Sequence, residues 1–218
     1  MIANVVSVSG GKDSTALLLL ALERGADPIA VFADTGHEHP LTYEYLDYLR
    51  SVLGVEIRAV RADFTKDFAR KRAYIAEKWP GKGVPQSKVD QALAAMHPTG
   101  NPFLDLCLWK GRFPSRKAQF CTEELKRNMA VSYQIDVADQ GHQVISWQGV
   151  RRDESPNRRH AKKIQRIGRG MYAFRPLVDW TAADVFAYCS EKGLQPNPLY
   201  KQGMGRVGCM PCINAGKE

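Results

Sequence analysis

A short polar stretch near the start of the chain gathers the residue types that bind a phosphate chain. Its two glycines leave backbone N–H groups free to turn toward an anion without obstruction by a side chain. A helix that begins directly after such a turn adds its positive N-terminal end. The lysine supplies a positive charge and the two serines supply hydroxyl donors. We therefore expect an anion-binding loop formed by Ser9, Gly10, Gly11, Lys12, Asp13 and Ser14.

Apolar strands and amphipathic helices alternate around this loop, and glycines follow the predicted helices. The pattern β-α-β-α-β is typical of a doubly wound, mostly parallel α/β sheet. In such sheets ligands bind at the carboxyl ends of the strands, which is where the loop lies. The predicted strands are Ile2–Val8, Pro28–Ala33 and Val55–Val60, and the predicted helices are Ser14–Arg24 and Pro40 to about Leu53.

The rest of the chain is less regular, and we treat residues 1–218 as a single domain. Residues of about 80–118 are rich in Gly, Pro and Gln and are interpreted as an insertion with a short helix. Residues 194–218 are expected to be irregular. The further predicted elements are helices at Lys66–Trp79, Lys88–Met96 and Glu123 to about Asp139 (capped by Thr122), a strand at Val144–Gln148, and a helix that opens on a capping box at Thr181–Asp184 and ends at Gly193.

The bulk composition limits the class of protein and its partners. A net charge of +8 favours partners that carry phosphate. No apolar run reaches the roughly 20 residues of a membrane helix, and no signal peptide is evident, so we expect a cytoplasmic protein without a membrane partner. Five cysteines in such a chain favour metal or redox chemistry over a disulfide framework.

The loop resembles the PP-loop signature of the ATP pyrophosphatases, and it matches neither the Walker loop nor the dinucleotide turn. Three further stretches resemble the phosphoadenosine phosphosulfate (PAPS) reductase family, in the same order along the chain. The resemblance covers most of the sequence outside roughly residues 66–113. The three stretches are "VFADTGHEHPLT", "WQGVRRDESPNRR" and the segment from "RPLVDW" to "GCMPC".

This resemblance implies a role for several residues. The backbone of the loop would bind the phosphates, and Asp34 and Thr35 would lie beside the nucleoside, although a turn-capping aspartate is an alternative interpretation. Guanidinium groups of the second stretch would bind phosphate or sulfate oxygens, unless this stretch is only a surface loop. Lys12, Asp13, Arg151 and Arg152 are the catalytic candidates. The remaining nucleotide-binding candidates are Gly149 and Arg158.

Four of the cysteines resemble the ligands of an iron–sulfur branch of the family. That branch has adjacent cysteines before a "TEELK"-like helix, whereas this chain has Phe120-Cys121. Cys107 is therefore taken as the fourth ligand, as in the related sulfur-transfer proteins of DNA phosphorothioation. Thiolates from separated segments suit a 4Fe-4S cluster or structural zinc, and free cysteines remain an alternative. The predicted ligands are Cys107, Cys121, Cys209 and Cys212, whereas Cys189 is predicted to lie in the core.

A second group of basic residues follows the arginine-bearing stretch. The stretch at 151–169 continues with Arg159, Lys162, Lys163, Arg166 and Arg169, which a nucleotide site does not require. These residues suit the backbone of a nucleic acid, and a solvated basic face is the alternative.

Three functions are consistent with these features. The first is ATP-dependent adenylation with Mg²⁺, coupled to sulfur transfer from a cysteine desulfurase or a thioredoxin-like donor. The second is reduction of PAPS, or of adenosine phosphosulfate, to sulfite with an external thiol, since no Glu-Cys-Gly-Leu-His-like motif follows Cys212 in this sequence. The third is a non-catalytic subunit that binds a nucleotide or DNA. We expect the first, because the complete loop motif is more typical of ATP enzymes.

Overall fold

A computed structural model describes residues 1–214 of the chain. Two compact units make up this part of the protein. The sheet unit comprises Met1–Ala33, Glu38–Val60 and residues 130–214, and the helical unit comprises Asp34–His37 and Arg61–Met129. Each unit has its own hydrophobic core and is described separately.

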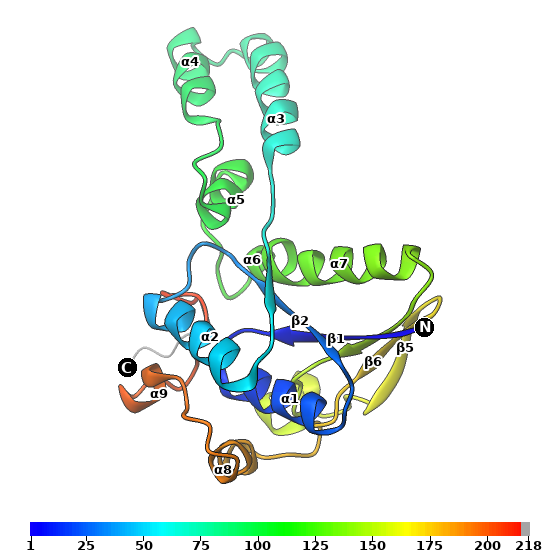
Figure 1. Ribbon diagram of the computed structural model, residues 1–218. Coiled ribbons are helices and arrows are strands. Elements are labelled where there is room, and N and C mark those ends of the chain that lie inside the picture. Colours follow the sequence, from blue (N-terminus) through cyan, green and yellow to red (C-terminus); the bar gives the residue numbers. More distant parts are fainter. Residues whose placement is uncertain (215–218) are drawn as a thin grey trace. The chain divides into compact units, whose positions relative to one another are not determined.

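The sheet unit contains six strands in the order β3-β2-β1-β4-β6-β5 (Figure 1). The pairs from β3 to β6 are all parallel, and β5 runs antiparallel to β6 at one edge. This arrangement confirms the predicted mostly parallel α/β sheet. The strands are β1 (Ile2–Val8), β2 (Pro28–Ala33), β3 (Ile57–Val60), β4 (Gln143–Trp147), β5 (Ile164–Gly168) and β6 (Met171–Phe174).

Helices cover both faces of the sheet, as a doubly wound fold requires (Figure 1). Helices α1 (Lys12–Glu23), α2 (Pro40–Leu53) and α8 (Ala182–Glu191) contribute to the core on one face. On the other face, Val137 of α7 (Asn128–Asp139) packs in a separate apolar cluster of the sheet unit, together with Val5 and Val144. Val5 and Val6 of β1 point to opposite faces, and both are fully buried. Each contributes roughly 1.5–3 kcal/mol through burial, which explains the unbroken apolar sequence of this central strand.

The helical unit is built from α3 (Thr65–Lys78), α4 (Gln86–Ala95), α5 (Pro102–Lys110) and α6 (Phe120–Thr122), followed by a π-helical turn at Glu123–Arg127. A short 3₁₀ turn, Pro80–Lys82, follows α3. The core of the unit is apolar, and its fully buried residues include Phe68, Ile75, Leu106 and Leu125.

Several local expectations from the sequence are wrong. Thr122 is not a helix cap, because α6 begins at Phe120 and places Thr122 in a helical conformation without a capping hydrogen bond. The segment after Leu194 is not wholly irregular, since α9 (Pro198–Lys201) forms there. Helix α5 and the hairpin of β5 and β6 were not predicted. No helix among residues 1–214 is both long and apolar enough to cross a membrane.

Candidate functional site

The loop at residues 9–14 joins the end of β1 to the start of α1, and its own side chains stabilise its shape. The backbone N–H of Ser9 donates to Ser14 Oγ at 3.1 Å, and the two serine hydroxyls lie 3.2 Å apart. Ser14 Oγ donates in turn to the carbonyl oxygen of Gly11 at 2.9 Å. Gly11 is the N-cap of α1 and has no side chain to cap the first turn. The first-turn amides of α1 are therefore not capped by the side chain of the N-cap residue.

Gly10 has to be a glycine for two reasons. Its φ of +71° lies in the left-handed region, which side chains rarely adopt. A Cβ at this position would also lie 3.0 Å from Cγ2 of Thr42, a fully buried residue of α2. The loop is therefore packed closely against α2 on one side.

Residues of α9 and its N-cap contact the loop from the C-terminal part of the sheet unit. The buried Asn197 side chain donates to the carbonyl oxygen of Gly10 at 3.1 Å and also caps α9 by accepting from the N–H of Leu199. The hydroxyl of Tyr200 accepts a hydrogen bond from the N–H of Lys12 at 3.0 Å. Burial raises the pKa of Tyr200, so this hydroxyl stays neutral at physiological pH. The sequence analysis did not assign these two residues, although Asn-Pro is a helix-start signal.

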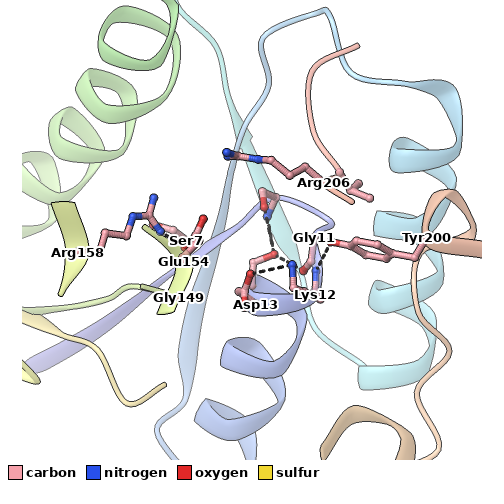
Figure 2. A pocket seen from close by; sticks show the side chains of 12 residues that line it. Ser7, Gly11, Lys12, Asp13, Gly149, Glu154, Arg158, Tyr200 and Arg206 are labelled. Carbon is pink, nitrogen blue, oxygen red and sulfur yellow. Dashed lines mark hydrogen bonds and ion pairs between the residues drawn. The ribbon is translucent and has the colours of Figure 1, made fainter. Parts of the chain in front are cut away.

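A cavity of about 250 Å³ opens above the loop within the sheet unit (Figure 2). Three cationic side chains line it, and so do two carboxylates and the hydroxyls of the loop serines and Tyr200. In Figure 2, Arg158 and Glu154 lie on one side of Lys12 and Tyr200 on the other. The full lining is Ser7, Ser9, Gly11, Lys12, Asp13, Ser14, Gly149, Glu154, Arg158, Tyr200, Arg206 and Val207. This polar, largely cationic lining suits a phosphate chain.

Asp13 connects the loop to Arg151. The Arg151 Nε donates to Asp13 Oδ1 at 2.5 Å, and Arg151 Nη1 contacts both carboxylate oxygens of Asp153 at 2.6 and 2.7 Å. Lys12 Nζ lies 3.6 Å from the second oxygen of Asp13. Burial by itself lowers the pKa of Arg151, but Asp13 and Asp153 outweigh it and raise the pKa overall. Arg151 therefore remains charged, with only 4% of its side chain exposed.

The other residues of the arginine-bearing stretch lie in different surroundings. Gly149 lines the cavity, and a Cβ there would lie 3.2 Å from the backbone of Asp13. Arg158 lines the cavity and pairs with Glu154. Arg152 is exposed, is not part of the lining, and contacts Asp179 and the carbonyl oxygen of Ala161. Of the three predicted arginines, only Arg158 is therefore directed to the cavity.

Asp34 and Thr35 directly follow β2 and belong to the helical unit. The Asp34 carboxylate accepts from the N–H of Gly36 at 2.9 Å and pairs with Arg61 Nε at 2.9 Å. Thr35 is fully buried, and its carbonyl oxygen accepts from the N–H of Phe103 at 3.0 Å. These contacts stabilise a turn at the carboxyl end of β2, and the nucleoside-binding role of both residues stays a prediction.

The four predicted ligand cysteines fall into two pairs, one in each unit. Cys107 of α5 and Cys121 of α6 share the core of the helical unit. The pKa of Cys107 is raised mainly by burial and also by the interaction with the nearby Cys121. In the sheet unit, the Cys209 thiol lies 3.6 Å from Glu38 Oε1, and Cys212 Sγ accepts from the N–H of Asn214. Within either unit, the described residues contain no group of three metal-binding side chains. The four-thiol site stays a prediction.

The mostly parallel α/β sheet with a glycine-rich loop after β1 defines a PP-loop-like nucleotide-binding fold. The family model described as "Phosphoadenosine phosphosulfate reductase domain" matches residues 3–215. The chain therefore belongs to the PAPS reductase domain family, a family of enzymes, which confirms the resemblance noted in the sequence.

Sequence and structural relatives agree with this assignment. The chain is 50% identical to the "uncharacterized 37.8 kDa protein in gpa 5'region" of Escherichia phage 186, covering 99% of this chain and 68% of that protein. It is 27% identical to a PAPS reductase of Aliivibrio salmonicida, covering 93% of this chain and 65% of that protein. The chain spans about two thirds of the length of these relatives. Its fold is similar to that of PAPS reductase from Candida auris, with a TM-score of 0.59, 18% identity and coverage of 96% and 82%.

Proposed function

We propose that the protein binds ATP through the loop at residues 9–14 and uses it to adenylate an acceptor to which sulfur is then transferred. The observation that carries this proposal is the cavity above the loop, where Lys12, Arg158 and Arg206 meet the loop serines. Its volume of about 250 Å³ is below the roughly 300–1,000 Å³ of sites that enclose a whole ligand. The cavity therefore suits the phosphate part of a nucleotide better than the complete molecule.

In the proposed reaction, negative charge develops on the leaving pyrophosphate, close to these cations. An acceptor oxygen attacks the α-phosphorus of ATP, the bond to the bridging oxygen of the β-phosphate breaks, and pyrophosphate leaves. Lys12 and Arg158 stabilise the charge that develops on the leaving group, and the loop amides orient it. Asp13 holds Lys12 in place and is itself held by the buried Arg151. Arg151 is thus a positioning residue in this proposal.

The cavity also has donors that fit Mg²⁺. This ion prefers oxygen ligands and usually binds through one or two carboxylates together with substrate phosphates. Glu154 lines the cavity and would hold it, whereas both oxygens of Asp13 already contact Arg151 and Lys12. When bound, the ion would neutralise phosphate charge and favour departure of pyrophosphate.

The sulfur step is assigned to the four cysteines, Cys107, Cys121, Cys209 and Cys212. Four thiolates are the donor set of a 4Fe-4S cluster or of structural zinc. A cysteine desulfurase or a thioredoxin-like protein would supply the sulfur or the electrons. Two of the proposed ligands belong to the helical unit and two to the sheet unit.

Reduction of PAPS is the second candidate, and the similarity to proteins named PAPS reductase favours it. In that reaction an external thiolate attacks the sulfonyl sulfur, the bond from sulfur to the phosphate oxygen breaks, and the adenosine bisphosphate leaves. A second external thiol then attacks the sulfur of the S-sulfonated thiol, so that a disulfide forms and sulfite leaves. The same cavity would then bind the phosphate end of PAPS rather than that of ATP.

Binding and product assays on the full chain distinguish the two candidates. Calorimetric titration with ATP and with PAPS is followed by measurement of pyrophosphate from ATP and of sulfite from PAPS with dithiothreitol. We expect ATP to bind more tightly, and Lys12→Gln to weaken ATP binding by about 10–100-fold, because it removes one charge-assisted contact worth about 1.5–3 kcal/mol.

The matched control is Lys88→Gln, which neutralises an exposed lysine of the helical unit. It should leave ATP affinity unchanged. Tight binding of PAPS with sulfite release, and no binding of ATP, would replace the first candidate by the second. Failure of both nucleotides to bind would overturn both.

A further inference from the structure

A second cavity, of about 320 Å³, shares Arg158 with the cavity above the loop at residues 9–14, which we call the nucleotide cavity from here on. It also belongs entirely to the sheet unit. Basic and amide side chains dominate its lining, and no carboxylate takes part in it. The lining comprises Gln148, Val150, Asn157, Arg158, His160, Ala161, Lys162, Gln165 and Arg175. The lining therefore contains positive side chains without negative ones, whereas an ordinary solvated surface carries charges of both signs.

Arg175 is the least compensated charge of this cavity. Its Nε donates to Gln148 Oε1 at 2.9 Å, and its Nη1 donates to the Lys162 carbonyl oxygen at 3.0 Å and to Gln165 Oε1 at 3.1 Å. All of these acceptors are neutral, and Arg175 forms no ion pair with any residue among 1–214. Burial lowers its pKa. A partly buried guanidinium without an anion is costly, and an anionic ligand would remove this cost.

Further basic residues lead away from this cavity along the edge of the sheet. The loop before β5 and the β5–β6 hairpin carry five exposed cations that form no ion pairs within the described part of the chain. They are Arg159, Lys162, Lys163, Arg166 and Arg169. Because β5 is the edge strand, the hairpin cations are open to solvent. Lys162 lines the cavity, and the exposed cations that follow it extend the positive charge beyond the cavity, which suits a chain of phosphates better than a single small anion.

We propose that the Arg175 cavity binds a backbone phosphate of a nucleic-acid strand, which continues along the exposed cations before and within the β5–β6 hairpin. The shared Arg158 would place this strand next to the nucleotide cavity. The strand's role as the acceptor of adenylation and sulfur rests on the proposed function, but its binding does not.

The test is fluorescence anisotropy with a labelled 20-nucleotide single-stranded DNA and the RNA of the same sequence, on the full chain, between 50 and 200 mM NaCl. Binding should fall steeply with salt, since each phosphate contact contributes about 0.7 to the slope for single strands. Lys162→Gln combined with Lys163→Gln should weaken binding about tenfold and reduce the slope by about 1 or more. Arg175→Gln, checked for folding by its melting curve, should act in the same direction.

The control is Lys66→Gln combined with Lys88→Gln, which removes two exposed charges from the helical unit and should leave binding unchanged. The proposal is overturned if neither strand binds at 50 mM NaCl, or if the control weakens binding as much as the double variant. It is also overturned if polyglutamate binds with the same dependence on Lys162 and Lys163, because the surface would then recognise negative charge in general.

Competition with ATP separates this proposal from the proposed function. If ATP displaces the strand and Lys12→Gln abolishes strand binding, the strand occupies the nucleotide cavity and the proposal is wrong. If the strand binds with the expected variant effects but ATP does not bind at all, the second cavity stands and the adenylation proposal fails.

Discussion

Arg151 belongs to the stretch predicted to bind phosphate, but it does not line the cavity above the loop. Its guanidinium is buried and contacts Asp13 and Asp153. Asp13 also contacts Lys12, so the three charges form a row that ends at the cavity. The position of the Lys12 ammonium thus depends on a residue that does not line the cavity.

We predict that Arg151→Gln destabilises the protein by about 3 kcal/mol. Removing one member of a buried ion pair costs about 3–5 kcal/mol, and the lower end applies because Asp13 and Asp153 are 20% and 42% exposed. Urea denaturation measures the change. The matched control is the neighbouring Arg152→Gln, whose surface pair with Asp179 contributes about 0–1 kcal/mol. Equal losses in the two variants would contradict the positioning role of Arg151.

At this scale the sequence indicated several residues that lie at one cavity, but not the contacts that they make. The motif identified the loop residues and Arg158, which the structure brings to one cavity. It did not reveal that Arg151 is buried, because one of the two carboxylates that it contacts, Asp13, lies far away in sequence. Tyr200 and Arg206 line the same cavity but lie almost 200 residues from the loop, and nothing in their local sequence indicates a phosphate site.

Helix α9 is short, but it connects two distant parts of the chain. Its N-cap, Asn197, uses one end of its amide to cap the helix and the other to contact Gly10 of the loop. Tyr200, one turn further, accepts from the N–H of Lys12. The helix therefore restricts the loop at two of its residues.

We predict that Asn197→Ala costs about 2–4 kcal/mol and also weakens ATP binding. Loss of an N-cap costs about 0.5–2 kcal/mol, and a buried carbonyl oxygen left without its donor costs about 1–3 kcal/mol more. Thermal denaturation and ATP titration measure the two effects. Thr181→Ala removes the N-cap of α8, whose hydroxyl exchanges hydrogen bonds with Asp184 of the same helix, so it should lose only about 1 kcal/mol and retain ATP affinity. A similar loss of ATP affinity in both variants would argue against a specific role of α9.

The elements that were predicted correctly have strong local signals. β1 and β2 are apolar and lie within the sheet, and α2 begins with Pro40 and ends at Gly54, which has a positive φ. The hairpin was missed for the opposite reason. Every residue from Ile164 to Ile167 is exposed, so β5 has no buried face and no alternation of apolar residues. The basic sequence of this segment is typical of a surface loop, whereas the structure pairs it with β6 at the edge of the sheet.

At the scale of the whole molecule, the cysteines separate into three environments. Cys107 and Cys121 belong to the helical unit, and Cys209 and Cys212 to the last described residues of the sheet unit. Cys189 is buried in α8, and burial raises its pKa to about 11. Its thiol stays protonated at neutral pH, but Cys107 is equally buried and its pKa is also raised, so the two thiols differ in the unit to which they belong rather than in burial. The sequence predicted the core position of Cys189 from its place on an amphipathic helix.

We predict that the protein purified without oxygen contains an iron–sulfur cluster of about four iron and four sulfide ions per chain. Iron and sulfide analysis and visible absorption measure it, with zinc determined on the same sample. Cys121→Ser and Cys212→Ser should each lose most of the iron, because each removes one of the four predicted ligands. Cys189→Ser is the matched control and should retain it. A colourless protein with one zinc would replace the cluster by a structural metal, and iron that survives both ligand substitutions would show that these cysteines do not bind it.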